Sequence, residues 1–235
     1  MNLSFRSEEK EIMDDLEVKG DVVIQTLKEL DVINRLLGGN QISLGPFKRI
    51  ASKMDEFSVL DLGCGSAEIL KLMAKWARDH NIKGRFVGVD ANPLITEYAR
   101  ENTAEFNEIE IVTDNIFNEK WQSPNFDIVH CCLFNHHFDS EENAQFLSGW
   151  SKNASHVIIN DLQRHAMAYH SIKWLTNLFS KSDMVKYDAK LSVARGFHRH
   201  ELEEILKEAE IEKYILKWRW AFRWQLVIST PGQDR

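Results

Sequence analysis

Residues 59–70, VLDLGCGSAEIL, hold the most distinctive spacing of chemically useful residues in the chain. They predict a short buried strand, a turn built on Gly63 and Gly65, and the start of an amphipathic helix. Because neither glycine has a Cβ, the backbone can bend sharply there and approach a ligand closely. The helix start offers unpaired N–H groups and the positive end of the helix dipole. The pattern therefore predicts a nucleotide-binding turn.

The residues around this turn favour a nucleotide that has no pyrophosphate. A dinucleotide fingerprint would need a third glycine at position 68, where the chain has Glu68. A carboxylate at the helix start would face the pyrophosphate, which is unfavourable. Asp61, at the end of the preceding strand, would instead suit a ligand with a cationic group. The sequence therefore argues against an NAD-dependent dehydrogenase.

Short apolar strands alternate with helices after this turn. We expect strands near residues 58–62, 85–90, 109–113, 126–132 and 156–160, with helices near 67–80, 92–102 and 140–150. This alternation predicts a parallel sheet covered by helices on both faces, with its ligand at the carboxyl ends of the strands. The candidates at that edge are Asp61, Gly63, Cys64, Gly65, Asp90, Ala91, Asn92, Asp114, Asn115, Ile116, Cys132, Leu133, His136, His137, Asn160 and Asp161.

Three acidic residues end three successive strands. Asp90 could accept two hydrogen bonds from ribose hydroxyls, and Asp114 could accept one from an adenine amino group. Ile116 could pack against the adenine ring. Each carboxylate alone could equally be a helix cap or a solvated loop residue. Their succession after a Gly-x-Gly turn is what favours a nucleotide site.

The order Asp61-x-Gly63-x-Gly65, then Asp90, then Asp114, resembles the class I S-adenosylmethionine (SAM) methyltransferases over about residues 57–160. The resemblance implies an α/β, Rossmann-like three-layer sandwich with a mixed seven-stranded sheet whose last strand is antiparallel. It also implies SAM as cofactor, S-adenosylhomocysteine as product, and cofactor contacts from the candidates between Asp61 and Leu133. Ala67 stands where the family usually has a third glycine, a departure that its small size should allow.

A narrower resemblance rests on segments outside this core. Residues 34–39, 134–138, 160–162 and 191–197 look like a bacterial subgroup of small-molecule methyltransferases, similar to the quinone-ring methyltransferases and associated with polyketide or aromatic pigment pathways. This resemblance implies a small aromatic or polyketide-like acceptor that is methylated on oxygen or carbon.

Methyl transfer from a sulfonium needs alignment and a dry site, and needs a base only if the acceptor must lose a proton. A phenol with a pKa near 10 would be helped by a histidine. His136 or His137 could be that base, and Asp161 and Arg164 could orient the substrate. Alternatively, one histidine packs, the other caps the helix at residue 140, and Asp161 and Arg164 form ordinary salt bridges or caps.

The sequence gives little support for a metal site. Strand four ends without a carboxylate, which leaves too few hard oxygen ligands for magnesium. Two histidines with Asp161 could form a transition-metal triad, but their spacing does not require one, and we expect no metal. Cys64, Cys131 and Cys132 form no CxxC pair and suggest reduced thiols in the cytoplasm.

Further segments flank the expected sheet. We expect residues 1–55 to form a helical cap, mostly helical from 1 to 50, with one helix stopped near Gly38–Asn40 and another opened by Pro46. Residues 56–235 would form the SAM-binding domain, with an insertion at about 162–198 that is helical over 164–180 and irregular over 181–197. A hairpin is expected over 211–230. Some aromatic residues could suit a flat acceptor or could only complete the core of the cap: Phe5, Phe47, Trp174, Phe179, Tyr187 and Phe197.

Composition sets broad limits on the partners. The 235 residues carry a net charge of −7, which argues against a general nucleic-acid or membrane-surface binder. There is no apolar run long enough to span a bilayer and no signal-peptide pattern, which with the cysteine usage favours the cytoplasm. We expect a monomer or homodimer. Two other functions stay open. One is an RNA or protein methyltransferase that uses the basic and aromatic residues of 213–224, and the other is a SAM-binding partner protein without catalysis.

Overall fold

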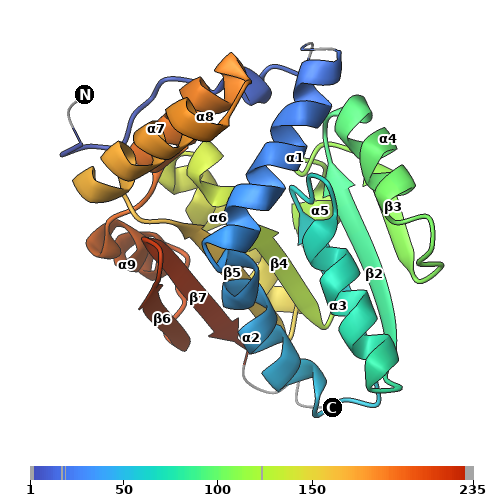
Figure 1. The fold of residues 1–235 in the computed structure, drawn as a ribbon. Coiled ribbons are helices and arrows are strands. Elements are labelled where there is room, and N and C mark those ends of the chain that lie inside the picture. The colour runs from blue at the N-terminus through green and yellow to red at the C-terminus, as the bar shows by residue number, and fades with distance from the viewer. Residues whose placement is uncertain (1–2, 17, 19, 123, 231–235) are drawn as a thin grey trace.

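A seven-stranded sheet forms the centre of the computed structural model, which describes residues 3–16, 18, 20–122 and 124–230 (Figure 1). The strand order is β3-β2-β1-β4-β5-β7-β6. β1 to β5 pair in parallel, and β7 is antiparallel to both of its neighbours. This arrangement confirms the predicted Rossmann-like mixed sheet. The strands are β1 (Glu56–Leu62), β2 (Lys83–Asp90), β3 (Ile109–Thr113), β4 (Ile128–Cys132), β5 (His156–Leu162), β6 (Tyr214–Arg219) and β7 (Arg223–Ser229).

Successive apolar side chains of each strand point to opposite faces of the sheet, so both faces are apolar and helices cover both. Val59 and Phe86 belong to one core, with side chains of α2 and α3, and Leu60 and Val87 belong to the other, with side chains of α6 and α9. The result is a three-layer sandwich. The helices of the first face are α2 (Gly39–Ala51), α3 (Glu68–Asp79) and α4 (Pro93–Asn102), and those of the second are α5 (Glu119–Gln122), α6 (Ser140–Asn153) and α9 (Arg199–Glu208).

Three further helices and two short 3-10 turns gather beyond the carboxyl ends of the parallel strands (Figure 1). They are α1 (Asp21–Leu36), α7 (Ala166–Phe179), α8 (Asp183–Arg195), η1 (Ile12–Asp14) and η2 (Asn135–His137). Among the described residues, no helix is both long and apolar enough to cross a bilayer.

The helix α8 corrects the expectation that residues 181–197 are irregular. Ser182 caps it by accepting a hydrogen bond from the Val185 N–H, and the helix ends before Gly196. Its buried residues lie on several sides, so the apolar pattern lacks the single stripe from which a helix is recognised. The sequence signal was therefore weak although the helix is regular.

The N-terminal expectation was also partly wrong. Before Asp21 the described residues are mostly non-helical, with η1 as the one short helical turn among them, and residues 1–2, 17 and 19 lie outside the described part. The second helix begins at Gly39, so Pro46 lies inside it instead of opening it. Proline has no N–H for the carbonyl of Ile42, four residues earlier. That carbonyl accepts a hydrogen bond of 2.6 Å from the Gln225 side chain of β7 instead.

A double-mutant cycle can test whether the Gln225 side chain replaces the helical hydrogen bond that Pro46 cannot make. Gln225→Leu should lower the free energy of unfolding by about 1–3 kcal/mol, because it leaves a buried carbonyl without a donor. In a Pro46→Ala background the new N–H at position 46 can bond Ile42, so the same change should cost less. Urea unfolding of the four proteins measures both costs. Equal costs in the two backgrounds would show that Gln225 does not compensate for Pro46.

Candidate functional site

A cavity of about 1180 Å³ lies at the carboxyl edge of the parallel strands, below α1, α7 and α8. Its wall runs from the glycine turn after β1 to the two histidines of η2. Of the predicted site residues, those that line it are Asp61, Gly63, Cys64, Gly65, Asp90, Ala91, Asn92, Asn115, Ile116, Cys132, Leu133, His136 and His137. The structure thus brings together residues from the ends of four strands, as the sequence indicated.

The glycine turn depends on backbone conformations that side chains disfavour. Gly63 and Gly65 have φ angles of 68° and 52°, and a Cβ on Gly63 would lie 2.2 Å from the Phe134 ring. Ala67 also has a positive φ, of 59°. This left-handed conformation explains why glycine is usual at that position, and it costs alanine about 1–2 kcal/mol.

Asp90 holds the turn in place from the end of β2. One carboxylate oxygen accepts a hydrogen bond from the Gly65 N–H at 3.2 Å, and the other accepts one from the Asn92 N–H at 3.0 Å. Burial raises the pKa of Asp90. Asn92 in turn caps α4 through the Leu94 N–H. Each carboxylate oxygen has a further lone pair, so Asp90 can still accept hydrogen bonds from a ligand.

A buried histidine that the sequence analysis missed supports the turn from beneath. His130 Nδ1 lies 2.7 Å from Asp61 Oδ1, and its Nε2 lies 2.9 Å from Ser43 Oγ of α2. Asn160 donates to the same Ser43 oxygen and to the Gly39 carbonyl. These bonds tie the N-terminal helix α2 to the strand ends that carry the site.

Asp114 does not line the cavity, in contrast to the other predicted cofactor residues. Hydrogen bonds from Lys120, at 2.6 Å, and from the Trp121 indole lower its pKa to about 2. The loop residues beside it, Asn115 and Ile116, face the cavity instead. The position of Asp114 therefore gives no support for the predicted contact with an adenine amino group.

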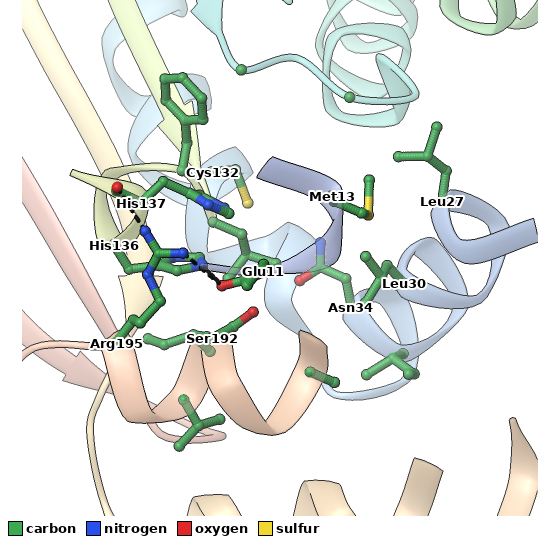
Figure 2. A pocket seen from close by; sticks show the side chains of 18 of the residues that line it. Glu11, Met13, Leu27, Leu30, Asn34, Cys132, His136, His137, Ser192 and Arg195 are labelled. Atoms are coloured by element: carbon green, nitrogen blue, oxygen red, sulfur yellow. Dashed lines mark hydrogen bonds and ion pairs between the residues drawn. The ribbon is translucent and has the colours of Figure 1, made fainter. Parts of the chain in front are cut away.

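The other end of the cavity is polar and is closed by the N-terminal segment (Figure 2). His136 is 2% exposed, with Nδ1 2.7 Å from Asp161 Oδ1 and Nε2 3.4 Å from Glu11 Oε1. Burial alone would lower the pKa of His136, but Asp161 and Glu11 outweigh it and raise this pKa to about 9. His136 is therefore charged at neutral pH and is unsuited to act as a base there.

His137 has a carboxylate partner of its own. Its Nδ1 lies 2.5 Å from Asp14 Oδ1, while the other oxygen of Asp14 binds Arg195. Arg195 also donates to the His137 carbonyl at 2.7 Å. Although burial opposes it, His137 and Arg195 hold the pKa of Asp14 well below its usual range. Asp14 thus fixes the ring of His137, which lines the cavity.

Glu11 and Asp14 were missed because no local pattern distinguishes them from other acidic residues. Both lie more than 120 residues from the histidines that they contact. The segment that carries them is anchored at several points. Arg6 donates to the His136 and Phe138 carbonyls, and Asp188 of α8 accepts hydrogen bonds from the Ile12 and Met13 N–H groups.

Arg164 has a structural role, in line with the salt bridge that the sequence analysis left open as the alternative to substrate orientation. It is fully buried and forms a two-bond ion pair with Glu201, at 3.0 and 2.6 Å. It also donates to the Leu3 carbonyl, which ties the N-terminal segment to this pair. Arg164 does not line the cavity, so its position gives no support for a role in orienting the substrate.

The expected aromatic lining was largely wrong. Of the six residues expected, Trp174 alone lines the cavity. Phe47 and Phe197 are fully buried in the two cores, whereas Phe5 and Phe179 are exposed. The aromatic residues found in the lining besides Trp174 are Phe117, Phe134, Phe138, Trp220 and Phe222. They come from loops and the hairpin turn, whose spatial positions depend on the completed sheet.

The cysteines are free, as expected. Burial raises the pKa of all three thiols, that of Cys132 to about 12. They are therefore protonated at neutral pH and unreactive as nucleophiles.

The charge on His136 should make the stability of the protein depend on pH. A histidine whose folded pKa is raised contributes its full stabilisation below the unfolded pKa of about 6.5. That contribution is lost as the pH rises through about 9. Urea unfolding at pH 6.5 and pH 9.5 should show a smaller loss of stability in Glu11→Gln than in wild type. A surface change, His200→Gln, should keep the wild-type loss, and a Glu11→Gln protein that also keeps it would contradict this account.

Comparison with known proteins agrees with this geometry. The sequence model of the methyltransferase domain family matches residues 53–212. No curated protein matches the chain. Among solved structures, the plantazolicin methyltransferase BpumL with S-adenosylhomocysteine shares the fold with a TM-score of 0.65 at 15% identity, over 89% of each chain.

Two other structures show the same fold. The pyocyanin biosynthetic protein PhzM has a TM-score of 0.62 at 17% identity, over 94% of this chain but 62% of that one, so this chain spans less than two thirds of PhzM. A SAM-dependent methyltransferase from Aquifex aeolicus has a TM-score of 0.60 at 16% identity, over 89% of this chain and 98% of that one. With more than half of its length matched by the family model, the chain belongs to the methyltransferase domain family of SAM-dependent enzymes.

Proposed function

We propose that this protein transfers a methyl group from SAM to an oxygen or carbon atom of a small, flat acceptor, aromatic or polyketide-like in character. The observation that carries the proposal is one continuous cavity that joins the glycine turn to the histidines of η2. Cofactor and acceptor would share this space, as a direct methyl transfer requires. Two proteins of similar fold, the plantazolicin methyltransferase BpumL and the pyocyanin biosynthetic protein PhzM, support a small-molecule acceptor by analogy.

The cofactor would lie along the strand ends. The turn of Asp61, Gly63, Cys64 and Gly65 would receive the amino-acid part, whose ammonium suits the acidic Asp61. Asp90 would accept hydrogen bonds from the ribose hydroxyls, while Ala91 and Asn92 lie beside it. The adenine ring would be enclosed by Asn115 and Ile116, and Cys132 and Leu133 would line the opposite wall. All of these residues border the cavity.

The acceptor would lie between this cofactor and the polar end of the cavity. Its oxygen would attack the methyl carbon as the bond from carbon to sulfur breaks, which leaves S-adenosylhomocysteine, and the acceptor proton would pass to His137 Nε2. Asp14 positions His137, and Asp161 positions His136. The charged His136 would stabilise the negative oxygen that develops.

The hairpin gives less support for a macromolecular substrate. Residues 223–228 of β7 and Leu216 of β6 are buried within the molecule, which leaves little of the hairpin available to a macromolecule, although Trp218 and Trp220 stay exposed. The net charge of −7 also disfavours RNA. We further propose that the protein acts in the cytoplasm as a monomer or homodimer.

Cofactor binding can be tested by isothermal titration with S-adenosylhomocysteine and with NAD. We expect micromolar binding of S-adenosylhomocysteine and much weaker binding of NAD. Asp90→Ala should weaken the former about tenfold or more, which corresponds to about 1.4 kcal/mol, because the ribose acceptors and the support of Gly65 are lost. Asp79→Asn, a change on the exposed end of α3, serves as control. Tighter binding of NAD would overturn the cofactor assignment.

Proton transfer can be tested with His137→Gln in a screen of phenolic and quinol acceptors. Turnover should fall about 10²–10⁴-fold, the usual contribution of a general base, while affinity for S-adenosylhomocysteine is kept. Asp14→Asn should lower turnover less, since it misorients the ring without removing it. Full turnover by His137→Gln would remove this residue from the mechanism. Cofactor binding without turnover on any acceptor would favour a non-catalytic SAM-binding partner.

A further inference from the structure

Glu11, His136 and His137 converge at the polar end of the cavity. One carboxylate oxygen of Glu11, one ring nitrogen of His136 and one ring nitrogen of His137 all lie within 4.8 Å of one another. Figure 2 shows the three side chains together, beside Ser192 and Arg195 of α8, with Met13, Leu27 and Leu30 across the cavity. Glu11 comes from the N-terminal segment, so the group forms only when that segment is in place.

Two of these atoms are buried and make no hydrogen bond of normal geometry in the described part of the chain, although they face each other as an ion pair. They are Glu11 Oε1 and His136 Nε2, on side chains that are 6% and 2% exposed. The two atoms lie 3.4 Å apart. Ligands bound at about 2.0–2.2 Å to one tetrahedral ion are separated by about 3.3–3.5 Å, so the observed gap fits an ion between them.

The far sides of both histidine rings are arranged as in metal sites. Metal-binding histidines usually donate the other ring N–H to a carboxylate, which orients the ring. Here Asp161 faces His136 Nδ1 at 2.7 Å, and Asp14 faces His137 Nδ1 at 2.5 Å. This leaves Nε2 of each ring as the nitrogen that can bind a ligand.

The local charge also favours a cation. Glu11, Asp14 and Asp161 surround the two histidines, and the facing cations are Arg195 and Arg6. Arg195 is already bound to Asp14 and lies 3.8 Å from Glu11 Oε1.

We propose that Glu11, His136 and His137 bind one divalent transition-metal ion of the zinc type, with its fourth coordination position open to the cavity. Two imidazoles and one carboxylate suit such an ion better than magnesium, which prefers oxygen ligands. The proposal replaces the expectation of no metal. It also differs from the triad with Asp161, because Asp161 lies behind His136 and Glu11 takes the third position.

Only the consequence for catalysis rests on the proposed function. A bound ion would contact the acceptor oxygen and lower its pKa, and His137 would then serve as a ligand in place of acting as the base. Ion binding itself requires nothing of the acceptor or of SAM. The two proposals can therefore fail separately.

The test uses the full chain, treated with a chelator and dialysed. Zn²⁺ binding is measured by isothermal titration, and Co²⁺ binding by the visible absorption of the four-coordinate ion. We expect one ion per chain in wild type, and affinity at least tenfold lower in both Glu11→Gln and His137→Gln. Asp161→Asn should weaken binding about 10–100-fold, as loss of a ligand-orienting partner does. His200→Gln, a change of an exposed histidine, should bind as wild type does.

Circular dichroism and titration with S-adenosylhomocysteine establish that each variant is folded. Because His137 is only partly buried, its variant remains informative if Glu11→Gln does not fold. Equal affinity of wild type and His137→Gln, or no binding beyond that of surface histidines, would overturn the metal site. Methyl transfer at full rate by metal-free protein that binds no ion would overturn it while supporting the proposed function. Tight ion binding without turnover would support the metal site and count against the proposed function.

Discussion

The structure of the site depends on one buried series of charges, Asp161–His136–Glu11. A charged imidazole that is 2% exposed is stable only because a carboxylate lies on each side of it. Asp161 is at the end of β5, His136 is in η2 after β4, and Glu11 is in the N-terminal segment. The series therefore joins the sheet to a segment that is distant in sequence.

The cofactor end is built on a second buried network that shares the same strands. His130 of β4 supports Asp61, and Asn160 of β5 holds the start of α2. These strands continue directly into Leu133, His136 and Asp161. A displacement of β4 or β5 would thus move the glycine turn and the histidines together. This common support explains how a reactive methyl group and an acceptor could be held in line across a wide cavity.

The elements that could be predicted are those set by local pattern. The strand over residues 109–113 has the expected bounds, and the glycine turn was evident because backbone conformation restricts the residue type. The elements that could not be predicted depend on distant partners. Pro46 can lie within a helix because the Gln225 side chain supplies the hydrogen bond that proline lacks. Glu11 lines the cavity because of contacts with residues distant in sequence, such as His136, which no local spacing reveals. The position of Arg164 after β5 suggested that it could orient a substrate or form a salt bridge, and its guanidinium in fact binds Glu201 and the Leu3 carbonyl.

The most direct test of this account is the pKa of His136, measured by nuclear magnetic resonance titration of histidine-labelled, metal-free protein. The two flanking carboxylates predict a pKa of about 9 in wild type. The value should fall in Glu11→Gln, because burial is then opposed by Asp161 alone. A wild-type His136 that titrates at or below about 6.5, the value of a free histidine, would contradict the buried charge series. Glu11 would then form no ion pair with a charged His136.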